Sequence, residues 1–391
     1  MMKKRLCAVL LSMVLLLSAC AFPSKYPIEK VENILMVGVD VSNSQIQLTV
    51  VVDDINRQSE PGKEQIGEKI YTSFGDTIFE AKRNMHTFSS KRLSWYHLKY
   101  ILIGEEAAKT GLDKVLDFFC ENDENRFLHR LIVSRGMSAS NFILATVTHD
   151  NSIADSLDSL MEESKNSGRS DEVHLLDYAS ACEAGSSIHI PTVQLQPAID
   201  HFPSLTEETG DTPAYVTQLE GFALFQDNKL TGYLNGPQSI SLNMVINRLK
   251  STSLTVMDDK GSPVSLEVIS SKAKIITDTQ NGLTVTIRII MLDSFMVEYH
   301  EKQDVLDDDY ISYLEKRQCE YVENSIRDTL KTAQQYGTDV FGIIEALCHS
   351  NHSYAEKIKD HWSEIFSALN IGIEVDTKIQ CTYSMINAAG N

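Results

Sequence analysis

The sequence predicts an α+β protein, and the C-terminal half carries the clearest evidence. Residues 283–291 and 371–381 alternate apolar and polar side chains, which is the pattern of half-buried strands. Between them lie two stretches with apolar residues at helical spacing. This order predicts helices packed on a mainly antiparallel sheet. The N-terminal half alternates strand and helix patterns, so we expect a mixed α/β chain of several domains, with mixed or antiparallel sheets flanked by helices.

Four strands and one helix are predicted in the N-terminal half. The strands are the apolar segments 34–39, 45–52, 100–104 and 131–134. The helix follows the third strand, because acidic residues begin it and one face is apolar; that face carries Ala108, Leu112, Val115, Leu116 and Phe119. The polar segment 53–69 contains Pro61-Gly62 and predicts a loop.

Each predicted element of the C-terminal half has an apolar face. The strand at 283–291 is expected to bury Leu283, Val285, Ile287, Ile289 and Met291 together. The first helix carries an apolar stripe from Ile311 to Ala333 and ends at Gly337. The second helix is expected to bury Ile358, Trp362, Ile365, Phe366 and Leu369. The alternating residues from Ile371 to Cys381 predict a closing strand.

Two polar stretches divide the chain. Residues 162–172 are rich in Ser, Asp and Glu and predict a loop-like connection within the first domain. The main boundary is expected at 201–213, where two prolines and a glycine separate folded segments. These breaks predict an N-terminal domain at 34–200 and a C-terminal domain at 214–391. A further split near residue 252 would divide the latter into a middle and a C-terminal domain.

The first twenty residues form a targeting segment. A basic start, Lys3 to Arg5, precedes an apolar run that is too short for a comfortable membrane span. Its end, Leu17-Ser18-Ala19-Cys20, resembles the lipobox of bacterial lipoproteins. In that family the signal peptide, here residues 1–19, is cut before the cysteine. Cys20 would then carry S-diacylglycerol and N-palmitoyl groups and begin a lipidated linker at 20–33. An ordinary secretory signal with a chance cysteine is the alternative.

The charge of the chain limits its partners. Removing the signal takes Lys plus Arg from 35 to 32 against 54 Asp plus Glu, so the mature chain has a formal charge of −22. Such a surface repels phosphate backbones and anionic headgroups, which argues against nucleic-acid binding and indicates that lipid, not a basic patch, anchors the protein. No later segment reaches 18 uninterrupted apolar residues, so we expect an ectodomain tethered outside the cytoplasmic membrane.

Five cysteines remain once Cys7 and Cys20 are assigned to the signal and the lipid site. They are Cys120, Cys182, Cys319, Cys348 and Cys381. An odd number at wide spacing does not resemble a disulfide framework. We therefore interpret these cysteines mainly as small apolar residues, and a single bridge stays open.

The sequence carries few signals of catalytic chemistry. It has no phosphate loop, no dinucleotide fingerprint, no Cys-x-x-Cys and no metalloprotease or serine-hydrolase motif. We therefore assign no catalytic, cofactor-binding or metal-ligating residue, and we expect a protein that is not an enzyme.

Three groups come closest to a site. The metal candidates are His349, His352 and His361 with Cys348, although the neighbouring Ser and Asn residues favour solvated histidines at a turn. The acidic run Asp304–Asp309 could attract calcium, but it lacks the spacing and glycine of an EF-hand loop and suits a helix N-terminus. Asp40, at a strand end, could be a catalytic carboxylate, but a turn or capping role is commoner.

Four parts of the chain resemble the Ger(x)C family, the lipoprotein C subunits of spore germinant receptors. They are residues 34–52, similar to the family's opening strand pair; residues 92–136; residues 221–235, with a turn at Asp227-Asn228; and GTDVFGIIEAL at 337–347, followed by Trp362 and the last strand. The resemblance follows the family order over nearly the whole mature chain.

These segments also have plain structural interpretations. Residues 221–235 predict a hairpin, Gly104 to Glu106 a strand-to-helix corner, DVFG a helix terminus, and Trp362 a core side chain. The chain departs from the family at Ala21-Phe22-Pro23, where relatives often have tryptophan-aspartate. It departs again at Ile343-Ile344, where many continue with phenylalanine-glycine.

The resemblance implies a non-enzymatic role. Family C subunits are held by lipid on the outer face of the inner spore membrane and work with two integral-membrane partners, A and B, to sense nutrients and start germination. The C subunit would be an accessory or signalling part, and the small-molecule site is usually assigned to the B subunit. We expect protein contacts through an exposed apolar residue in 221–235 or after Gly104.

Two other classes remain as alternatives. A lipoprotein solute-binding protein that feeds a transporter would have two similar α/β lobes around a deep cleft, whereas the two halves of this chain differ. A lipid-anchored envelope hydrolase is disfavoured because nucleophile and metal motifs are missing from the sequence.

Overall fold

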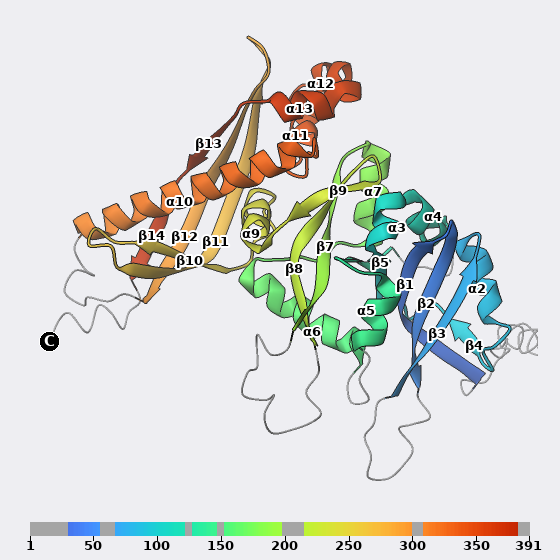
Figure 1. Ribbon diagram of the computed structural model, residues 1–391. Coiled ribbons are helices and arrows are strands. Elements are labelled where there is room, and N and C mark those ends of the chain that lie inside the picture. Colours follow the sequence, from blue (N-terminus) through green and yellow to red (C-terminus); the bar gives the residue numbers. More distant parts are fainter. Residues whose placement is uncertain are drawn as a thin grey trace, which may run out of the picture.

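The computed structural model describes residues 30–54, 67–121, 127–146, 152–197, 215–298 and 308–381. The predicted signal peptide, Cys20 and the boundary segment 201–213 lie outside these ranges. Figure 1 shows a nine-stranded sheet with helices on both faces, followed by a five-stranded sheet along which one long helix lies. The predicted α+β class, with mixed sheets flanked by helices, is confirmed.

The nine-stranded sheet is parallel at its centre and antiparallel at its edges. Its strands are β1 Val31–Ser42, β2 Gln45–Asp54, β3 Gly67–Gly75, β4 Arg92–Ser94, β5 Tyr100–Gly104, β6 Arg130–Ser134, β7 Ile188–Pro197, β8 Tyr215–Gln226 and β9 Lys229–Leu234. They follow the order β3-β2-β1-β5-β6-β7-β8-β9, and β4 pairs with the start of β1. The pairs β1–β5, β5–β6 and β6–β7 are parallel, whereas β3–β2, β2–β1, β7–β8 and β8–β9 are antiparallel.

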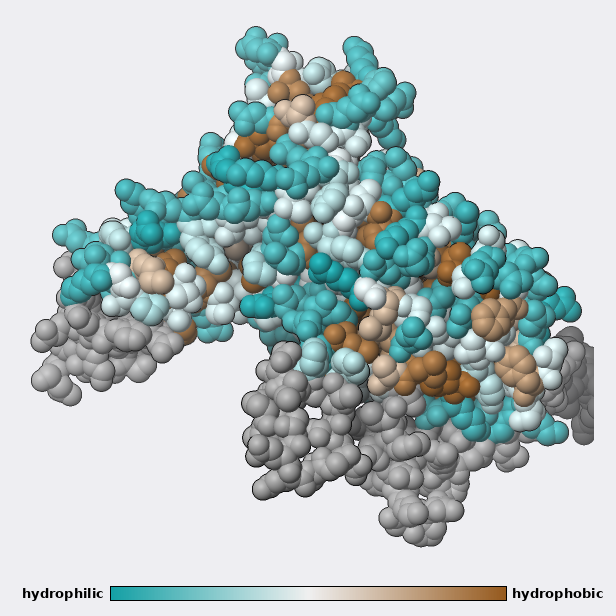
Figure 2. Space-filling model, viewed as in Figure 1, coloured by the Kyte–Doolittle hydropathy of each residue, from teal (hydrophilic) through white to brown (hydrophobic). Residues whose placement is uncertain are grey.

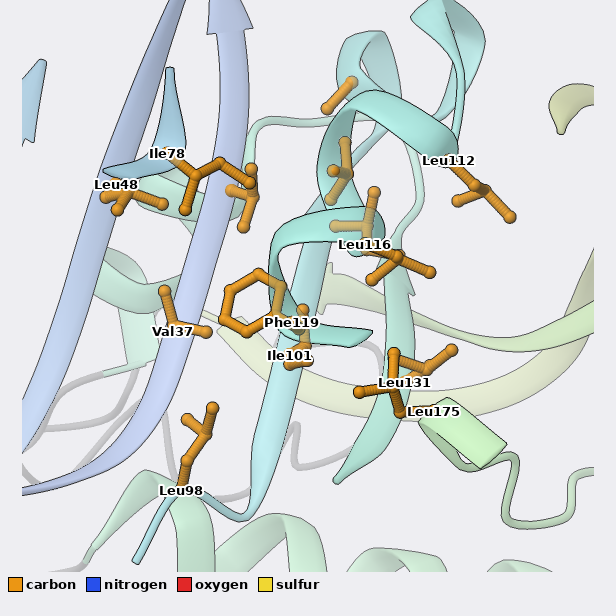
Figure 3. Close-up of a cluster of buried hydrophobic side chains, with 14 of the residues drawn as sticks. Val37, Leu48, Ile78, Leu98, Ile101, Leu112, Leu116, Phe119, Leu131 and Leu175 are labelled. Carbon is orange, nitrogen blue, oxygen red and sulfur yellow. The ribbon is translucent and has the colours of Figure 1, made fainter. Parts of the chain in front are cut away.

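Helices cover both faces of this sheet and bury a core on each. One face carries α2 Ile78–Met85, α3 Glu105–Thr110, α4 Asp113–Glu121 and α7 Leu175–Ala184; the other carries α5 Ala139–Thr146 and α6 Ile153–Ser167. Every residue of β5 is buried, because Ile101 and Ile103 enter the first core while Tyr100 and Leu102 enter the second. Figure 3 shows Phe119 of α4 packed over Ile101 in the first core.

One helix prediction and one loop prediction in this half were wrong in their limits. The single helix expected around Ala108 to Phe119 is divided into α3 and α4, because Gly111 has φ +139° and stops α3. Its predicted apolar face is nevertheless buried in the first core. The loop-like segment 162–172 is helical as far as Ser167, where α6 ends at Gly168 with φ +70°.

The five-stranded sheet follows a short helix, α9 Gly236–Val245. Its strands are β10 Thr252–Met257, β11 Pro263–Asp278, β12 Thr284–Glu298, β13 Ile371–Val375 and β14 Lys378–Cys381. β10, β11 and β12 are antiparallel, whereas β13 and β14 both run parallel to β12. The long helix α10 Asp308–Gln335 covers one face with Leu314, Val322, Ile326 and Leu330. Its extent matches the predicted first helix.

One predicted side-chain position on β12 was wrong. Val285, Ile287 and Ile289 are buried as expected, but Met291 is exposed. Lys272 on β11 pairs with Met291 and Ala273 pairs with Ile289, so Ile290 is an extra residue in β12. A bulge of one residue moves all later side chains to the opposite face. From there on, Leu292, Ser294 and Met296 are buried instead.

The C-terminal helix and strand predictions were each correct in place but too simple. The segment from Ile343 to Ala368 forms α11 Ile343–Ser350, α12 His352–Ile358, the 3₁₀ turn η5 Lys359–His361 and α13 Trp362–Ala368. Trp362 and Phe366 are buried, as predicted. The closing strand is divided into β13 and β14, because Asp376 and Thr377 bond to Ile289 and Leu292 on either side of the bulge in β12.

The change from one sheet to the other comes later than the expected boundary at 201–213. β8 and β9 follow that boundary but complete the nine-stranded sheet. Alternate residues of β8 serve two cores: Ala223 and Phe225 enter the first core of the nine-stranded sheet, whereas Phe222 and Leu224 pack with the C-terminal helices. The β8–β9 hairpin therefore joins the two sheets through its two faces.

Candidate functional site

A cavity of about 490 Å³ lies where the C-terminal helices meet the nine-stranded sheet. Its wall combines residues 184–187 between α7 and β7, the β8–β9 turn, and residues between 339 and 363 on α11 to α13. This volume is within the range that small ligands occupy. The titratable lining residues are Asp227, Asp339, Glu345, Cys348, His349, His352, Lys359 and Asp360. Carboxylates therefore outnumber the permanent cation, Lys359.

Asp339 organises one end of this cavity. Its Oδ1 accepts hydrogen bonds from the amides of Phe341 and Ile343, both at 3.2 Å. Its Oδ2 accepts from the amide of Ile344 at 2.9 Å and from the indole Nε1 of Trp362 at 3.0 Å. The carboxylate thus satisfies amides at the start of α11 and ties that helix to α13. The DVFG segment is a helix terminus, as predicted, with Gly342 at φ +78°.

Burial, with a smaller contribution from the negative charge of Glu345, raises the pKa of Asp339 to about 6, although the amide and indole donors act in the opposite direction. Glu345 Oε2 is itself buried and finds no hydrogen-bond donor among the described residues. Two carboxyl groups therefore lie close together in a region of low solvent access, which favours a bound cation or proton there.

On another part of the cavity wall, the positive side chain of Lys359 lies against the end of α7. Gly185 ends α7 with φ +64°, and the Nζ of Lys359 would be 3.7 Å from a Cβ at that position. The carbonyl end of a helix attracts cations, so this lysine suits its place. The contact joins α7 of the N-terminal half to η5 of the C-terminal half across the cavity.

The structure brings only part of the predicted histidine group together. Cys348, His349 and His352 line the cavity, whereas His361 lies outside its wall. Over the described ranges, no three His, Cys, Asp or Glu side chains are placed to hold a metal ion. The cavity therefore offers charge and hydrogen bonds but no converging ligand set.

The two acidic candidates have structural roles where they are described. Asp40 is buried, and its two oxygens accept from the amides of Ala139 at 2.7 Å and Ser140 at 2.8 Å. It thereby caps α5 from a residue nearly a hundred positions away. In the run Asp304–Asp309, the first four residues lie outside the described ranges, and Asp308 and Asp309 begin α10.

The two segments expected to offer an exposed apolar contact instead pack against each other. The amide of Leu112, just after α3, donates to Asn228 O at 2.7 Å in the hairpin turn, where Asp227 and Asn228 have φ 51° and 63°. The hairpin prediction is confirmed, but its apolar side chains are buried or half-buried between two cores. The expectation of an exposed apolar contact residue in these segments was therefore wrong.

The cysteines behave as unpaired thiols where their side chains are described. Cys120, Cys182, Cys319 and Cys348 are free. Burial raises the pKa of Cys120 to about 11, with Asp117 adding to the shift, so this thiol stays protonated at neutral pH. Among these four side chains there is no disulfide bridge.

Asp339, Glu345 and Lys359 were not singled out from the sequence. Asp339 lies in the quoted segment GTDVFGIIEAL, but an acid before a helix is an ordinary capping signal. What makes these residues a group is the approach of α7, the β8–β9 turn and α11 to α13, which no local pattern reveals. In the described part of the chain, no helix combines the length and apolar character needed to cross a membrane.

Two family models match the chain in succession. The model described as spore germination protein N-terminal domain matches residues 24–195, and the one described as spore germination B3/GerAC like, C-terminal, matches residues 220–383. The first match ends before the predicted boundary at 201–213, and the second begins after it.

Individual proteins give the same result. Spore germination protein B3 of Bacillus subtilis (strain 168) is 25% identical over 325 residues, which cover 81% of this chain and 80% of that protein. Spore germination protein KC of the same strain is 23% identical over 389 residues, 95% of each chain. The crystal structure of the GerBC protein has the same fold, with a TM-score of 0.58 at 21% identity, and the match covers 88% of this chain and 96% of that one.

Proposed function

Because this chain belongs to the Ger(x)C family of spore germination proteins, we propose that it is the lipid-anchored C subunit of a nutrient germinant receptor. The observation that carries the proposal is the match of both family models, in order, to residues 24–195 and 220–383. The protein acts with two integral-membrane subunits, A and B, on the outer face of the inner spore membrane.

The proposed anchor is Cys20, acylated after cleavage following Ala19. The lipobox residues 17–20 and the basic, apolar segment before them support this assignment. Acyl chains contribute about 0.8 kcal/mol per buried methylene, and two or three chains hold a protein far more firmly than one. An anchor of this kind would keep the chain beside its proposed membrane partners.

A non-catalytic role is supported by what the buried acidic groups do. Asp40 and Asp339 accept hydrogen bonds from backbone amides at helix starts, which is a structural task. The raised pKa of Cys120 disfavours a thiolate. The protein then contributes surfaces and position to the receptor, and its partners supply the transport chemistry.

Spores that lack this protein provide the first test. Their germination on single nutrients, followed by loss of optical density, should fail for one nutrient class and persist for others. A chain with Cys20→Ala should fold but fail to restore the response, because it is no longer held at the membrane. Full restoration by that variant would exclude the anchor, and unchanged germination on every nutrient, together with no co-purifying membrane partner, would exclude the receptor role.

The cavity favours a second candidate function, the binding of a small polar solute. Isothermal titration with amino acids and sugars tests it directly, since tight binding by this chain alone would place a solute site here. Glu345→Gln should then weaken binding of a cationic solute at least tenfold. Glu364→Gln is the matched control, because Glu364 is exposed on α13 outside the wall. No measurable heat with any solute would reject this function.

A further inference from the structure

One stretch of this acidic protein combines several cations with a lack of acidic residues. From Ala81 to Gly104 the chain has Lys82, Arg83, Lys91, Arg92 and Lys99 but neither Asp nor Glu, although Asp and Glu outnumber Lys and Arg by 54 to 35 over the whole sequence. A local surplus of positive charge of this kind does not determine the fold, but it gives the protein a surface that attracts anions.

The structure places the first part of this stretch, on α2 and β4, beside β1, β2 and β3 of the nine-stranded sheet, together with exposed aromatic rings. Phe79, Phe88 and Tyr96 are 53%, 51% and 55% exposed. We call this surface the α2–β4 face and define it by Phe79, Arg83, Phe88, Lys91, Arg92 and Tyr96. Figure 2 shows apolar side chains on the surface near α2 and β4 as the chain is viewed in Figure 1. Half-exposed aromatic rings are costly in water unless a partner covers them.

Contacts within the face hold it together. The guanidinium of Arg83 lies 5.7 Å from the ring centre of Phe79, one helical turn away on α2. Lys82 reaches the ring of Trp95 at 5.1 Å, which joins α2 to the turn that carries Tyr96. Phe88 packs on Tyr71 with ring centres 6.2 Å apart.

The acidic groups beside the face are engaged. Glu32 is 2% exposed and contacts Lys69 at 3.1 Å and Lys91 at 3.9 Å. Glu80, in the first turn of α2, accepts from the amide of Asp76 at 2.7 Å. Even with Glu32 and Glu80 counted, the four cations Lys82, Arg83, Lys91 and Arg92 give this region a formal surplus of positive charge.

The face lies next to the point where the chain leaves the proposed anchor. Val31 at the start of β1 pairs with Arg92 of β4. Only ten residues, 21–30, separate Val31 from Cys20. A segment of ten residues spans at most about 35 Å when fully extended. An acylated Cys20 is therefore held within about 35 Å of Val31, which lies beside β4 of the α2–β4 face.

We propose that the α2–β4 face rests on the anionic surface of the membrane and orients the protein there; this inference rests on the proposed anchoring at Cys20. Aromatic rings partition into the headgroup region, while Arg and Lys side chains pair with anionic lipid phosphates. The overall charge of −22 opposes membrane contact in general, so a face on which cations outnumber acids meets the least repulsion. The tether supplies most of the affinity, and the face adds a weaker, salt-dependent contact that sets the orientation.

The test uses the chain from residue 20 with Cys20→Ala, which has no acyl group, so only the protein surface can bind. Co-sedimentation with phosphatidylglycerol–phosphatidylcholine vesicles should show binding that high salt abolishes, and pure phosphatidylcholine vesicles should bind much less. Adding Arg83→Gln and Arg92→Gln should weaken binding on the order of thirtyfold, since each cation near an anionic surface contributes about fivefold. Adding Phe79→Ser should also weaken it.

Matched controls keep the result specific. Arg317→Gln with Lys331→Gln removes the same charge from α10, where both side chains are exposed, and should leave vesicle binding unchanged. Equal binding to both vesicle types, or equal loss in the α10 control, would overturn the proposal. A third result would also overturn the proposal: the parent chain does not bind vesicles, yet spores with Arg83→Gln and Arg92→Gln germinate poorly. In that case the α2–β4 face would contact a protein and not a membrane. Labelling of the wild-type chain with radioactive palmitate tests acylation separately, so the two failures are distinguishable.

Discussion

The buried carboxylate of Asp339 allows a quantitative prediction about the C-terminal helices. Asp339→Ala removes the acceptor for the amide of Ile344 at 2.9 Å and for the indole of Trp362 at 3.0 Å. Hydrogen bonds to a charged group contribute about 1.5 to 3 kcal/mol each. Loss of both should lower the free energy of unfolding by about 3 to 6 kcal/mol, which is a large share of the stability of an ordinary domain.

A double-mutant cycle separates the Trp362 bond from the rest. Trp362→Phe keeps most of the packing against Phe366, whose ring centre is 6.2 Å away, but removes the indole donor. It should cost about 1.5 to 3 kcal/mol alone and much less in the presence of Asp339→Ala, because the two changes remove the same bond. Urea unfolding of the unacylated chain, followed by far-UV circular dichroism, measures both. Full additivity, or a loss below about 1 kcal/mol for Asp339→Ala, would refute this account of the cavity wall.

Three further outcomes follow from the same structure. The pKa of Asp339 is raised from 3.8 to about 6, chiefly by burial, so the folded state binds this proton more tightly than the unfolded state. The bound proton therefore favours folding below about pH 4, and this contribution is lost as the pH rises through about 6. In urea titrations, the stability of the wild type relative to Asp339→Asn should fall by up to about 3 kcal/mol across that window. Asp40→Asn should cost about 1 to 3 kcal/mol in the same assay, since an amide nitrogen would face the N–H of Ala139 or Ser140, and an unchanged midpoint would contradict the capping role. Gly111→Ala should destabilise by about 1 to 3 kcal/mol, because φ is +139° and the new Cβ would lie 2.4 Å from Asp113 Oδ1, whereas a neutral result would mean that the α3–α4 corner relaxes without cost.

Local sequence patterns predicted an element well where the burial of its faces determines the order of apolar and polar residues. Val285, Ile287 and Ile289 alternate and are buried, and β5 is a continuous apolar run because both its faces are covered. The prediction failed at Met291, since the extra residue Ile290 in β12 leaves no mark in the hydrophobic pattern. A bulge is decided by the pairing of two strands, and the sequence of one strand does not contain it.

The candidate site was less accessible to prediction, because its parts are distant along the chain. Cys348, His349 and His352 were noted for their residue types, and they do line the cavity. The sequence offered no reason to place residues 184–187 or the β8–β9 turn opposite them. The same holds for Asp40, whose partner helix begins at Ala139. Long-range capping by a carboxylate is visible only once β1 and α5 are side by side.

The sheet order relates the two surfaces proposed for function. β3, beside α2, is at one edge of the nine-stranded sheet, and β9, beside the C-terminal helices, is at the other end of a path of eight strands. At about 4.8 Å between neighbouring strands, the seven gaps along this path put the two edges about 34 Å apart. Figure 1 shows α2 and β4 at one end of the molecule and the five-stranded sheet at the other. The α2–β4 face lies near the β3 edge, whereas the cavity lies beside the β8–β9 turn. A single partner that contacted both would therefore have to extend over most of the width of the nine-stranded sheet.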